Sequence, residues 1–240
     1  MPSADKRQRK KENARAAREA REAEIKKQRR NRTIRNGAIA AGVFVVGFGF
    51  LTWINGGSSK KAASTTTTST TPFVEVKKLP TKGVTATIKT ALGNIVLALD
   101  SKNDPIAARH FASVAKSGAY NGSAWTRIVK DFVIQGGAPG GDKTATFGHP
   151  VVGEVPKNHY PVGVVAAAKK GSDPPGTFDS EFFIVTGASQ GATLANDYAR
   201  FATVKSGMDV VRKIEAIPAD PTTGDPTTKV TIVSVTIKGA

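Results

Sequence analysis

The chain has 240 residues, enough for one sizeable domain with extensions, and its hydrophobic content of 39% with 24 glycines is ordinary for a globular protein. It contains no cysteine, which excludes disulfide bonds, thiolate catalysis and cysteine-ligated metal sites. The formal net charge of +16 is concentrated at one end, because residues 1–36 hold 14 Lys and Arg against 5 Asp and Glu, whereas residues 83–240 hold 16 against 13. The charge therefore describes a tail and does not indicate a nucleic-acid-binding enzyme.

Residues 1–36 form a basic tail that we predict to be cytoplasmic. Good helix formers dominate it, and Glu22 and Lys26 are four residues apart, so ion pairs could support one solvated helix. It lacks an apolar stripe, so it is either disordered or a single charged helix. We favour a solvated flank of a membrane segment; attraction to anionic lipid through charge is the alternative, and binding of nucleic acid is the least favoured.

Residues 37–54 contain no charged side chain and, apart from Thr52, only apolar residues and glycine. Eighteen residues of helix span about 27 Å, close to the bilayer core of about 30 Å, and Trp53 stands where an interfacial anchor is expected. A cleaved signal peptide is the competing interpretation, but the long basic segment before it and the absence of an Ala-x-Ala site directly after Ile54 favour an uncleaved signal anchor. The charge asymmetry predicts a single-pass cell-membrane protein with its amino terminus inside and the following domain extracytoplasmic.

Residues 55–82 are predicted to be a linker, because they hold a run of Ser and Thr from Ser64 to Thr71 and no periodic apolar pattern. Such a segment would separate a domain over residues 83–240 from the membrane and leave it free to turn.

The domain is predicted to be mainly β. Alternating apolar residues on both sides of the turn at Ala91–Asn94 predict a β-hairpin between Val84 and Asp100, and Asp104-Pro105 predicts a helix that begins with an N-cap aspartate and ends at Gly118. Further elements are expected as strands at 163–168, 181–186, 199–204 and 229–238 and a helix at 207–216. Strands interrupted by only two helices favour a closed or nearly closed antiparallel barrel with capping helices.

The most informative stretch runs from Trp125 to Pro139. Its alternation predicts strand, short turn and strand, followed by two consecutive glycines. Within it, Arg127 is followed by Phe132, Val133 and Gln135 at intervals of five, six and eight residues.

This stretch resembles the Arg-x-x-x-x-Phe-x-x-Gln-Gly-Gly signature of the cyclophilin family of peptidyl-prolyl cis-trans isomerases. Similar segments follow in the family's order, and the resemblance extends from about Val84 to Ile237. They are Gly163-Val-Val-Ala-Ala-Ala, Ser180-Glu-Phe-Phe-Ile, Leu194-Ala-Asn-Asp-Tyr-Ala-Arg-Phe-Ala and Gly207-Met-Asp-Val-Val-Arg-Lys-Ile. The resemblance implies an eight-stranded closed antiparallel barrel with its site on an outer face, and a monomer that assists folding by acting on X-Pro bonds of other polypeptides.

Ten residues are expected to form the site. Arg127 is the expected catalytic donor, because a fixed guanidinium aimed at the prolyl nitrogen would stabilise the twisted amide, and Gln135 is expected to orient it. The expected substrate-binding residues are Phe132, Val133, Ala168, Lys169, Glu181, Phe183, Leu194 and Tyr198. Phe182, beside Phe183, is expected to belong to the core, and for Phe132 a core position is an open alternative. Rotation about an amide needs no cofactor, and the scattered His110, His149 and His159 predict no metal site.

Several positions depart from the family pattern. Lys169 replaces the usual Asn, Glu181 the usual Gln and Tyr198 a frequent His, while Thr193 stands where some members have a Trp that contacts cyclosporin-type ligands. Because Lys169 and Glu181 border one groove with opposite charges, we expect a salt bridge between them. These substitutions also keep open an alternative function, a module that binds proline-containing segments without useful turnover.

Overall fold

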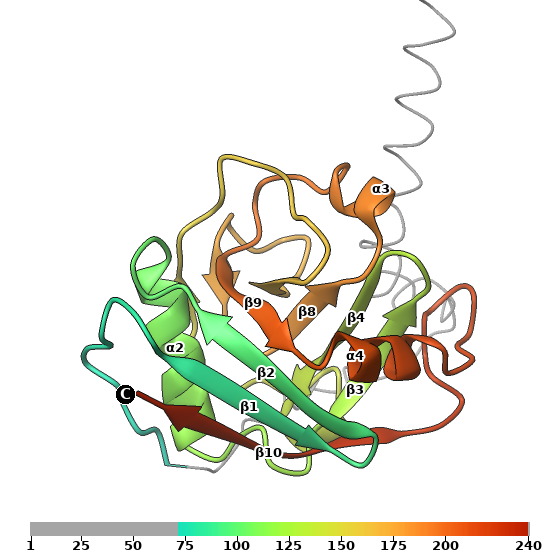
Figure 1. The fold of residues 1–240 in the computed structure, drawn as a ribbon, viewed down its shortest axis with the longest axis horizontal. Coiled ribbons are helices and arrows are strands. Elements are labelled where there is room, and N and C mark those ends of the chain that lie inside the picture. The colour runs from blue at the N-terminus through green and yellow to red at the C-terminus, as the bar shows by residue number, and fades with distance from the viewer. Residues whose placement is uncertain (1–71, 240) are drawn as a thin grey trace, which may run out of the picture. The chain divides into compact units, whose positions relative to one another are not determined.

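The computed structural model of the chain describes residues 72–239, and Figure 1 shows their fold. Eight strands close into a barrel in the order β1-β10-β3-β4-β8-β6-β9-β2, and every neighbouring pair is antiparallel. The barrel strands are β1 (Thr85–Thr90), β2 (Gly93–Leu99), β3 (Ala124–Val129), β4 (Val133–Ala138), β6 (Val164–Ala167), β8 (Phe182–Val185), β9 (Arg200–Ser206) and β10 (Val230–Lys238). The predicted barrel is confirmed, and the predicted strands and helices match those observed to within two residues at each end.

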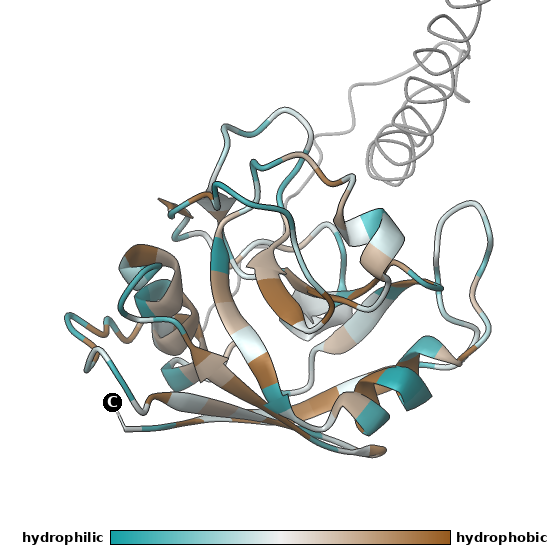
Figure 2. Cartoon of the chain, turned by 45° about the horizontal axis from the view of Figure 1, so that its top comes forward, coloured by the Kyte–Doolittle hydropathy of each residue, from teal (hydrophilic) through white to brown (hydrophobic). Residues whose placement is uncertain are grey.

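The remaining elements lie around the barrel. They are the helices α2 (Pro105–Lys116), α3 (Ala188–Gly191) and α4 (Met208–Glu215), the 3-10 helix η2 (Pro139–Gly141), and the strands β5 (Val151–Val152) and β7 (Thr177–Phe178), which pair with each other. In Figure 1, α2 and α4 lie at opposite sides of the barrel. Both helices turn an apolar face inward, and Figure 2 shows hydrophilic residues on the outer surface of α4.

In the first hairpin, β1 and β2, the alternation of apolar and polar residues decides which side chains face the barrel interior. In β1, Ala86 and Ile88 are completely buried, whereas Lys89, the residue after Ile88, is exposed. Successive side chains of a strand point to opposite faces, so the apolar set of β1 faces the interior. The hydroxyl of Thr90 donates to the carbonyl of Gly93 (2.8 Å) and closes the turn into β2.

The barrel interior is filled by aromatic and branched side chains. Phe111 from α2 stacks on Phe201 from β9 with ring centroids 4.7 Å apart, and it meets Phe182 from β8 edge-on at 5.6 Å. Trp125 also packs edge-on against Phe182. Phe182 is therefore a core residue, as predicted.

The helix α2 begins where it was predicted to begin, but its first turn is capped by a different residue. Asp104 occupies the N-cap position but makes no capping hydrogen bond. Its carboxylate instead accepts from Arg200 Nε at 2.9 Å. The free amides of the first helical turn are satisfied from another loop, because the carboxylate of Glu154 accepts from the backbone N–H of Ile106 (2.9 Å) and of Ala107 (3.2 Å).

The predicted linker is shorter than expected at its carboxyl end. Val76 and Leu79 are buried in the main core, and the amides of Val74 and Val76 donate to the hydroxyls of Ser117 (2.7 Å) and Ser113 (2.9 Å) on α2. The segment from residue 74 to residue 79 therefore packs on α2 as part of the domain. The boundary at residue 82 was wrong because two isolated apolar residues carry no periodic signal in the sequence.

The predicted basic tail, the signal anchor over residues 37–54 and the Ser/Thr run lie outside the described residues. Within residues 72–239, no helix has both the length and the apolar character needed to cross a membrane.

Candidate functional site

A row of four side chains crosses the outer face of the barrel. Strand register places Arg127 opposite Gln135, Gln135 opposite Phe183, and Phe183 opposite Ala166. Residues directly opposite each other on neighbouring strands point to the same face. The adjacent row, Ile128, Ile134, Ile184 and Val165, belongs to the barrel core. The predicted pair Arg127 and Gln135 is thus brought together on the outside of the barrel with Phe183.

A β-bulge in β3 sets the position of Arg127. Trp125 pairs with Gly136 and Arg127 with Gln135, so β3 advances two residues while β4 advances one, and Thr126 is the extra residue. A bulge bends the strand and re-aims the side chains beside it. Gly136 is needed at this point, because a Cβ there would lie 2.7 Å from the carbonyl oxygen of Ala124. The first glycine after Gln135 therefore permits the close strand approach on which the bulge depends.

An apolar cluster separate from the barrel core lies beside this row. It contains five of the six apolar residues that were predicted to bind substrate, and four more complete it; the full set is Phe132, Val133, Tyr160, Val164, Ala166, Phe183, Val185, Leu194 and Tyr198. Phe183 and Tyr198 meet edge-on with ring centroids 5.5 Å apart. Phe132 belongs to this cluster and not to the main barrel core.

Tyr160 holds the segment that carries Tyr198. Its hydroxyl donates to the carbonyl of Tyr198 (2.9 Å) and accepts from the amide of the same residue (3.0 Å). Burial raises the pKa of Tyr160 to about 12, so the hydroxyl remains a donor at neutral pH. Tyr160 was not predicted as a site residue, because a lone tyrosine in a loop gives no periodic signal.

The turn between Pro218 and Thr227 supports Arg127 from behind. The amide of Ile128 donates to the carbonyl of Gly224 at 2.8 Å. Gly224 has a φ of +76°, and a Cβ on it would lie 2.8 Å from Cγ of Arg127. The carboxylate of Asp220 organises the turn by accepting from the amides of Thr222 (2.8 Å) and Thr223 (2.7 Å). The turn composition Asp-Pro-Thr-Thr-Gly-Asp was readable from the sequence, but its contact with Arg127 was not.

The Arg127 side chain is only 7% exposed. Burial lowers the pKa of its guanidinium, and the proximity of Tyr198 partly offsets this effect. An arginine side chain nevertheless keeps its charge in a protein, so Arg127 presents fixed N–H donors in a poorly hydrated setting.

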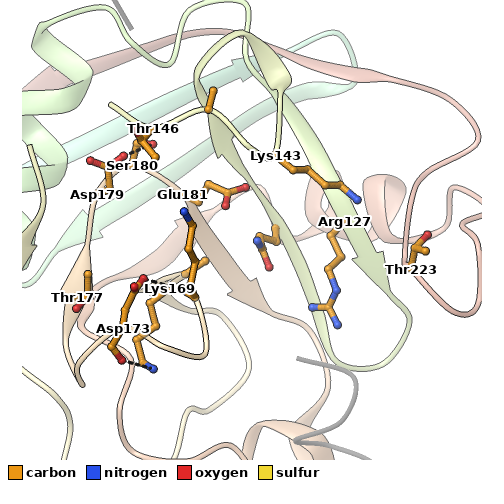
Figure 3. A pocket seen from close by; sticks show the side chains of 14 residues that line it. Arg127, Lys143, Thr146, Lys169, Asp173, Thr177, Asp179, Ser180, Glu181 and Thr223 are labelled. Atoms are coloured by element: carbon orange, nitrogen blue, oxygen red, sulfur yellow. Dashed lines mark hydrogen bonds between the residues drawn. The ribbon is translucent and has the colours of Figure 1, made fainter. Parts of the chain in front are cut away.

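A cavity of ≈ 80 Å³ adjoins Arg127 and Gln135 (Figure 3). Its lining comes from β3 and β4, the loop after β4, the segment between β6 and β8, and the turn between Pro218 and Thr227. The lining residues are Arg127, Gln135, Lys143, Ala145, Thr146, Ala168, Lys169, Lys170, Asp173, Thr177, Asp179, Ser180, Glu181 and Thr223. Three predicted residues, Ala168, Lys169 and Glu181, therefore border the same cavity as the predicted catalytic pair.

The expected salt bridge between Lys169 and Glu181 is wrong. Lys169 Nζ lies 3.1 Å from Oδ2 of Asp197 and donates to the carbonyl of Asp173 at 3.2 Å. It also sits 5.5 Å from the centroid of the Tyr198 ring. The flexible stem of lysine lets the ammonium fold back onto the Asp197 loop, which the sequence could not place beside it.

Glu181 points into the cavity from the segment before β8. Burial raises the pKa of its carboxyl to about 7, although hydrogen bonding from Gln135 and the positive charge of Lys143 partly offset that effect. Lys143 was not among the predicted site residues, and it also forms an ion pair with Asp225. Lys143 thus links the glycine-rich loop to the turn behind Arg127.

Ala168 joins the cavity to the apolar cluster, against which it packs. Its amide donates to the carbonyl of Glu181 at 2.8 Å, so this N–H is already used within the domain. Within residues 72–239, no three His, Asp or Glu side chains come together as a metal site would require.

Comparison with known proteins places the same region in one family. The profile described as "Cyclophilin type peptidyl-prolyl cis-trans isomerase/CLD" matches residues 85–237. A "Peptidyl-prolyl cis-trans isomerase-like 1" of Neurospora crassa is 32% identical over 157 residues, which cover 62% of this chain and 91% of that protein. A "Peptidyl-prolyl cis-trans isomerase" of Helicobacter pylori is 42% identical over 101 residues, covering 41% of this chain and 60% of that protein.

Two crystal structures of a Cryptosporidium parvum cyclophilin type peptidyl-prolyl cis-trans isomerase are also similar. The first has a TM-score of 0.58 and 26% identity, covering 65% of this chain and 98% of that one. The second, determined in the presence of the dipeptide Ala-Pro, has a TM-score of 0.58 and 25% identity, covering 65% of this chain and 99% of that one.

Proposed function

The chain belongs to the cyclophilin-type family of peptidyl-prolyl cis-trans isomerases, and from this premise we propose that it uses Arg127 to isomerise X-Pro bonds of extracytoplasmic proteins and so assists their folding. The observation that carries the assignment of the site is the outer row of Arg127, Gln135 and Phe183 beside a separate apolar cluster. A donor and an apolar surface adjoin there, outside the barrel core.

The reaction needs little covalent chemistry. Amide resonance gives the X-Pro bond a barrier of about 20 kcal/mol, and uncatalysed rotation takes tens to hundreds of seconds. In the twisted state the prolyl nitrogen loses resonance, becomes pyramidal and can accept a hydrogen bond. A donor that contacts this nitrogen in the twisted state alone lowers the barrier, and each 1.4 kcal/mol or so is worth a factor of ten in rate.

Arg127 is the donor in this proposal. Its low exposure strengthens a hydrogen bond to the prolyl nitrogen, and the turn at Gly224 limits the movement of its stem. Gln135, opposite Arg127, can accept from the guanidinium and donate to a substrate carbonyl.

The apolar cluster would hold the proline ring through Phe132, Val133, Phe183 and Leu194, with Tyr198 at its border. Because the amide of Ala168 already donates to Glu181, backbone pairing with the peptide would use Lys169. The Lys169 side chain, paired with Asp197, would not cover the groove.

The proposal is tested by turnover of a succinyl-Ala-Ala-Pro-Phe peptide, measured both by a protease-coupled assay and by NMR exchange. We expect Arg127→Ala to lower kcat/KM by about 100-fold or more, the loss that follows removal of one transition-state donor. Arg127→Lys is the matched control, because it keeps the charge but not the planar fork, and it should recover only part of the activity.

Full activity in folded Arg127→Ala would reject its catalytic role. Peptide binding without turnover in the unmodified protein would instead support the alternative of a proline-binding module. The substitutions at Lys169 and Glu181 are the features that favour that alternative.

The cellular arrangement is a further part of the proposal. The uncharged stretch at residues 37–54, behind a basic tail, supports a single membrane anchor with the amino terminus in the cytoplasm and the isomerase domain outside. We propose that this domain is a monomer. The tail would contact anionic lipid by charge. Protease added to sealed cells should degrade the domain; a domain that is cleaved only after lysis would show that the orientation is wrong.

A further inference from the structure

Residues 72–79 form a strap that precedes the part of the chain shared with the family, whose match begins at residue 85. Val76 and Leu79 of the strap are buried in the main core, so its path across α2 is fixed. Near the start of the strap, the Phe73 side chain is 37% exposed and is not part of that core. The Phe73 ring contacts a different part of the domain.

Phe73 joins the strap to the loop after β4. Its ring stacks on the imidazole of His149 with centroids 4.4 Å and planes 16° apart, and it lies 5.8 Å from the ring of Phe147. Phe147 and His149 meet edge-on at 5.4 Å. Stacked and edge-on aromatic pairs are favourable beyond the apolar area that they bury. The three rings therefore form one cluster that couples the strap to this loop.

The same loop forms one wall of the cavity in the candidate site. Thr146, directly before Phe147, lines the cavity, and so does Asp179 from the segment before β8. The carboxylate of Asp179 accepts from the three backbone amides of residues 147–149, at 2.5, 2.9 and 3.1 Å. Figure 3 shows Thr146 beside Asp179 at this wall. A shift of the aromatic cluster would therefore move the wall of the cavity.

We propose that Phe73 is a positioning residue of the isomerase, which fixes this wall through His149 and Phe147 before a substrate enters. The inference rests on the proposed function, because it takes the cavity as the place where the residues next to the X-Pro bond bind. A wall that is ordered beforehand reduces the conformational entropy lost on binding. Phe73 does not touch the reacting atoms, so its removal should weaken substrate binding and leave the rotation step unchanged.

The wall has a second support that limits the expected effect. Nε2 of His110, on α2, lies 2.5 Å from the carbonyl oxygen of Asp179 and forms a hydrogen bond with it. This contact does not involve the strap. Loss of the Phe73 ring should therefore loosen the loop without unfolding the segment before β8.

The test compares Phe73→Ala with Val74→Ala in the full chain, using NMR exchange on Ala-Pro peptides. Val74 is the matched control, because its side chain is 45% exposed and its hydrogen bond to Ser117 uses the backbone amide, which alanine keeps. We expect Phe73→Ala to raise KM about fivefold and to leave kcat within about twofold, the size that loss of one aromatic pair allows. Val74→Ala should change neither constant, and Phe73→Tyr, which keeps the ring, should keep the original KM.

Hydrogen exchange of the amides of residues 147–149 provides a measurement that needs no turnover. These amides bond to Asp179, and they should exchange about fivefold faster in Phe73→Ala than in Val74→Ala. His149→Ala removes the other ring of the stack. The effects of Phe73→Ala and His149→Ala should therefore be less than additive in the double variant.

An unchanged KM in folded Phe73→Ala, or an equal rise of KM in Val74→Ala, would overturn the inference. Unchanged exchange of the three loop amides in Phe73→Ala would overturn it as well. Failure of the proposed function is distinguishable, because the unmodified chain would then turn over no peptide, whereas the exchange measurement would still decide whether Phe73 holds the loop.

Discussion

The side chains on the inner and outer faces of β8 are equally buried, but they belong to different hydrophobic clusters. Phe182 and Phe183 are both 0% exposed, yet Phe182 packs in the barrel core and Phe183 in the outer cluster with Tyr198. Burial alone would assign both to the core. The strand period of two and the register with Gln135 separate them, so a buried aromatic residue is assigned to a site by its face and not by its exposure.

The largest expected effect on the inner face is a loss of stability without a loss of activity. Phe182→Ala should lower the free energy of unfolding by about 3–5 kcal/mol, because it leaves a cavity among Phe111, Trp125 and Phe201. Activity per folded molecule should be retained. Urea unfolding together with turnover on folded protein measures both quantities, and a variant that is stable but inactive would contradict the comparison.

Phe132→Ala tests the outer face. We expect kcat/KM to fall at least about tenfold per folded molecule, since the aromatic surface that would hold proline is lost. The stability cost should also reach about 3–5 kcal/mol, because Phe132 is 1% exposed. Phe132→Leu is the matched control and should recover part of the activity. A large drop in melting temperature with unchanged activity per folded molecule would return Phe132 to a structural role.

Gly224→Ala asks whether the turn behind Arg127 matters for catalysis. The new methyl would lie 2.8 Å from Cγ of Arg127 and should displace the guanidinium, reducing kcat/KM by about tenfold. Gly83→Ala is the control, because Gly83 has a similar φ of +79° but no atom within 4 Å of an added Cβ. Both should lose about 1 kcal/mol of stability to backbone strain, and equal activity in the two variants would exclude the turn from positioning Arg127.

The smallest effect concerns Lys169. Its pairing with Asp197 should contribute a coupling energy of about 0.5–1 kcal/mol, because the Lys169 side chain is 5% exposed and the Asp197 side chain 31%. A double-mutant cycle with Lys169→Asn and Asp197→Asn measures this coupling from urea unfolding. The corresponding cycle with Glu181→Gln should be additive, and coupling between Lys169 and Glu181 would restore the salt bridge that the structure does not contain.

Local patterns were sufficient for the elements of the fold. The alternation in Thr85–Thr90 and the Asp-Pro start of α2 predicted their strand and helix, because side-chain period and proline geometry act over a few residues. The spacing of Arg127, Phe132 and Gln135 indicated the site through its resemblance to a family. Asp104 occupies the predicted N-cap position, but its carboxylate accepts from Arg200, 96 residues away, and makes no capping hydrogen bond.

The sequence by itself therefore determined the succession of strands and helices, the family and the residue types at the site. Only the tertiary structure decided which charges pair, that Gly224 supports Arg127, and that Glu181 borders the cavity beside Arg127. The physical reason is the distance along the chain over which each interaction acts. Backbone periodicity is written in neighbouring residues, whereas ion pairs, close approaches and burial depend on loops that only closure of the barrel brings together.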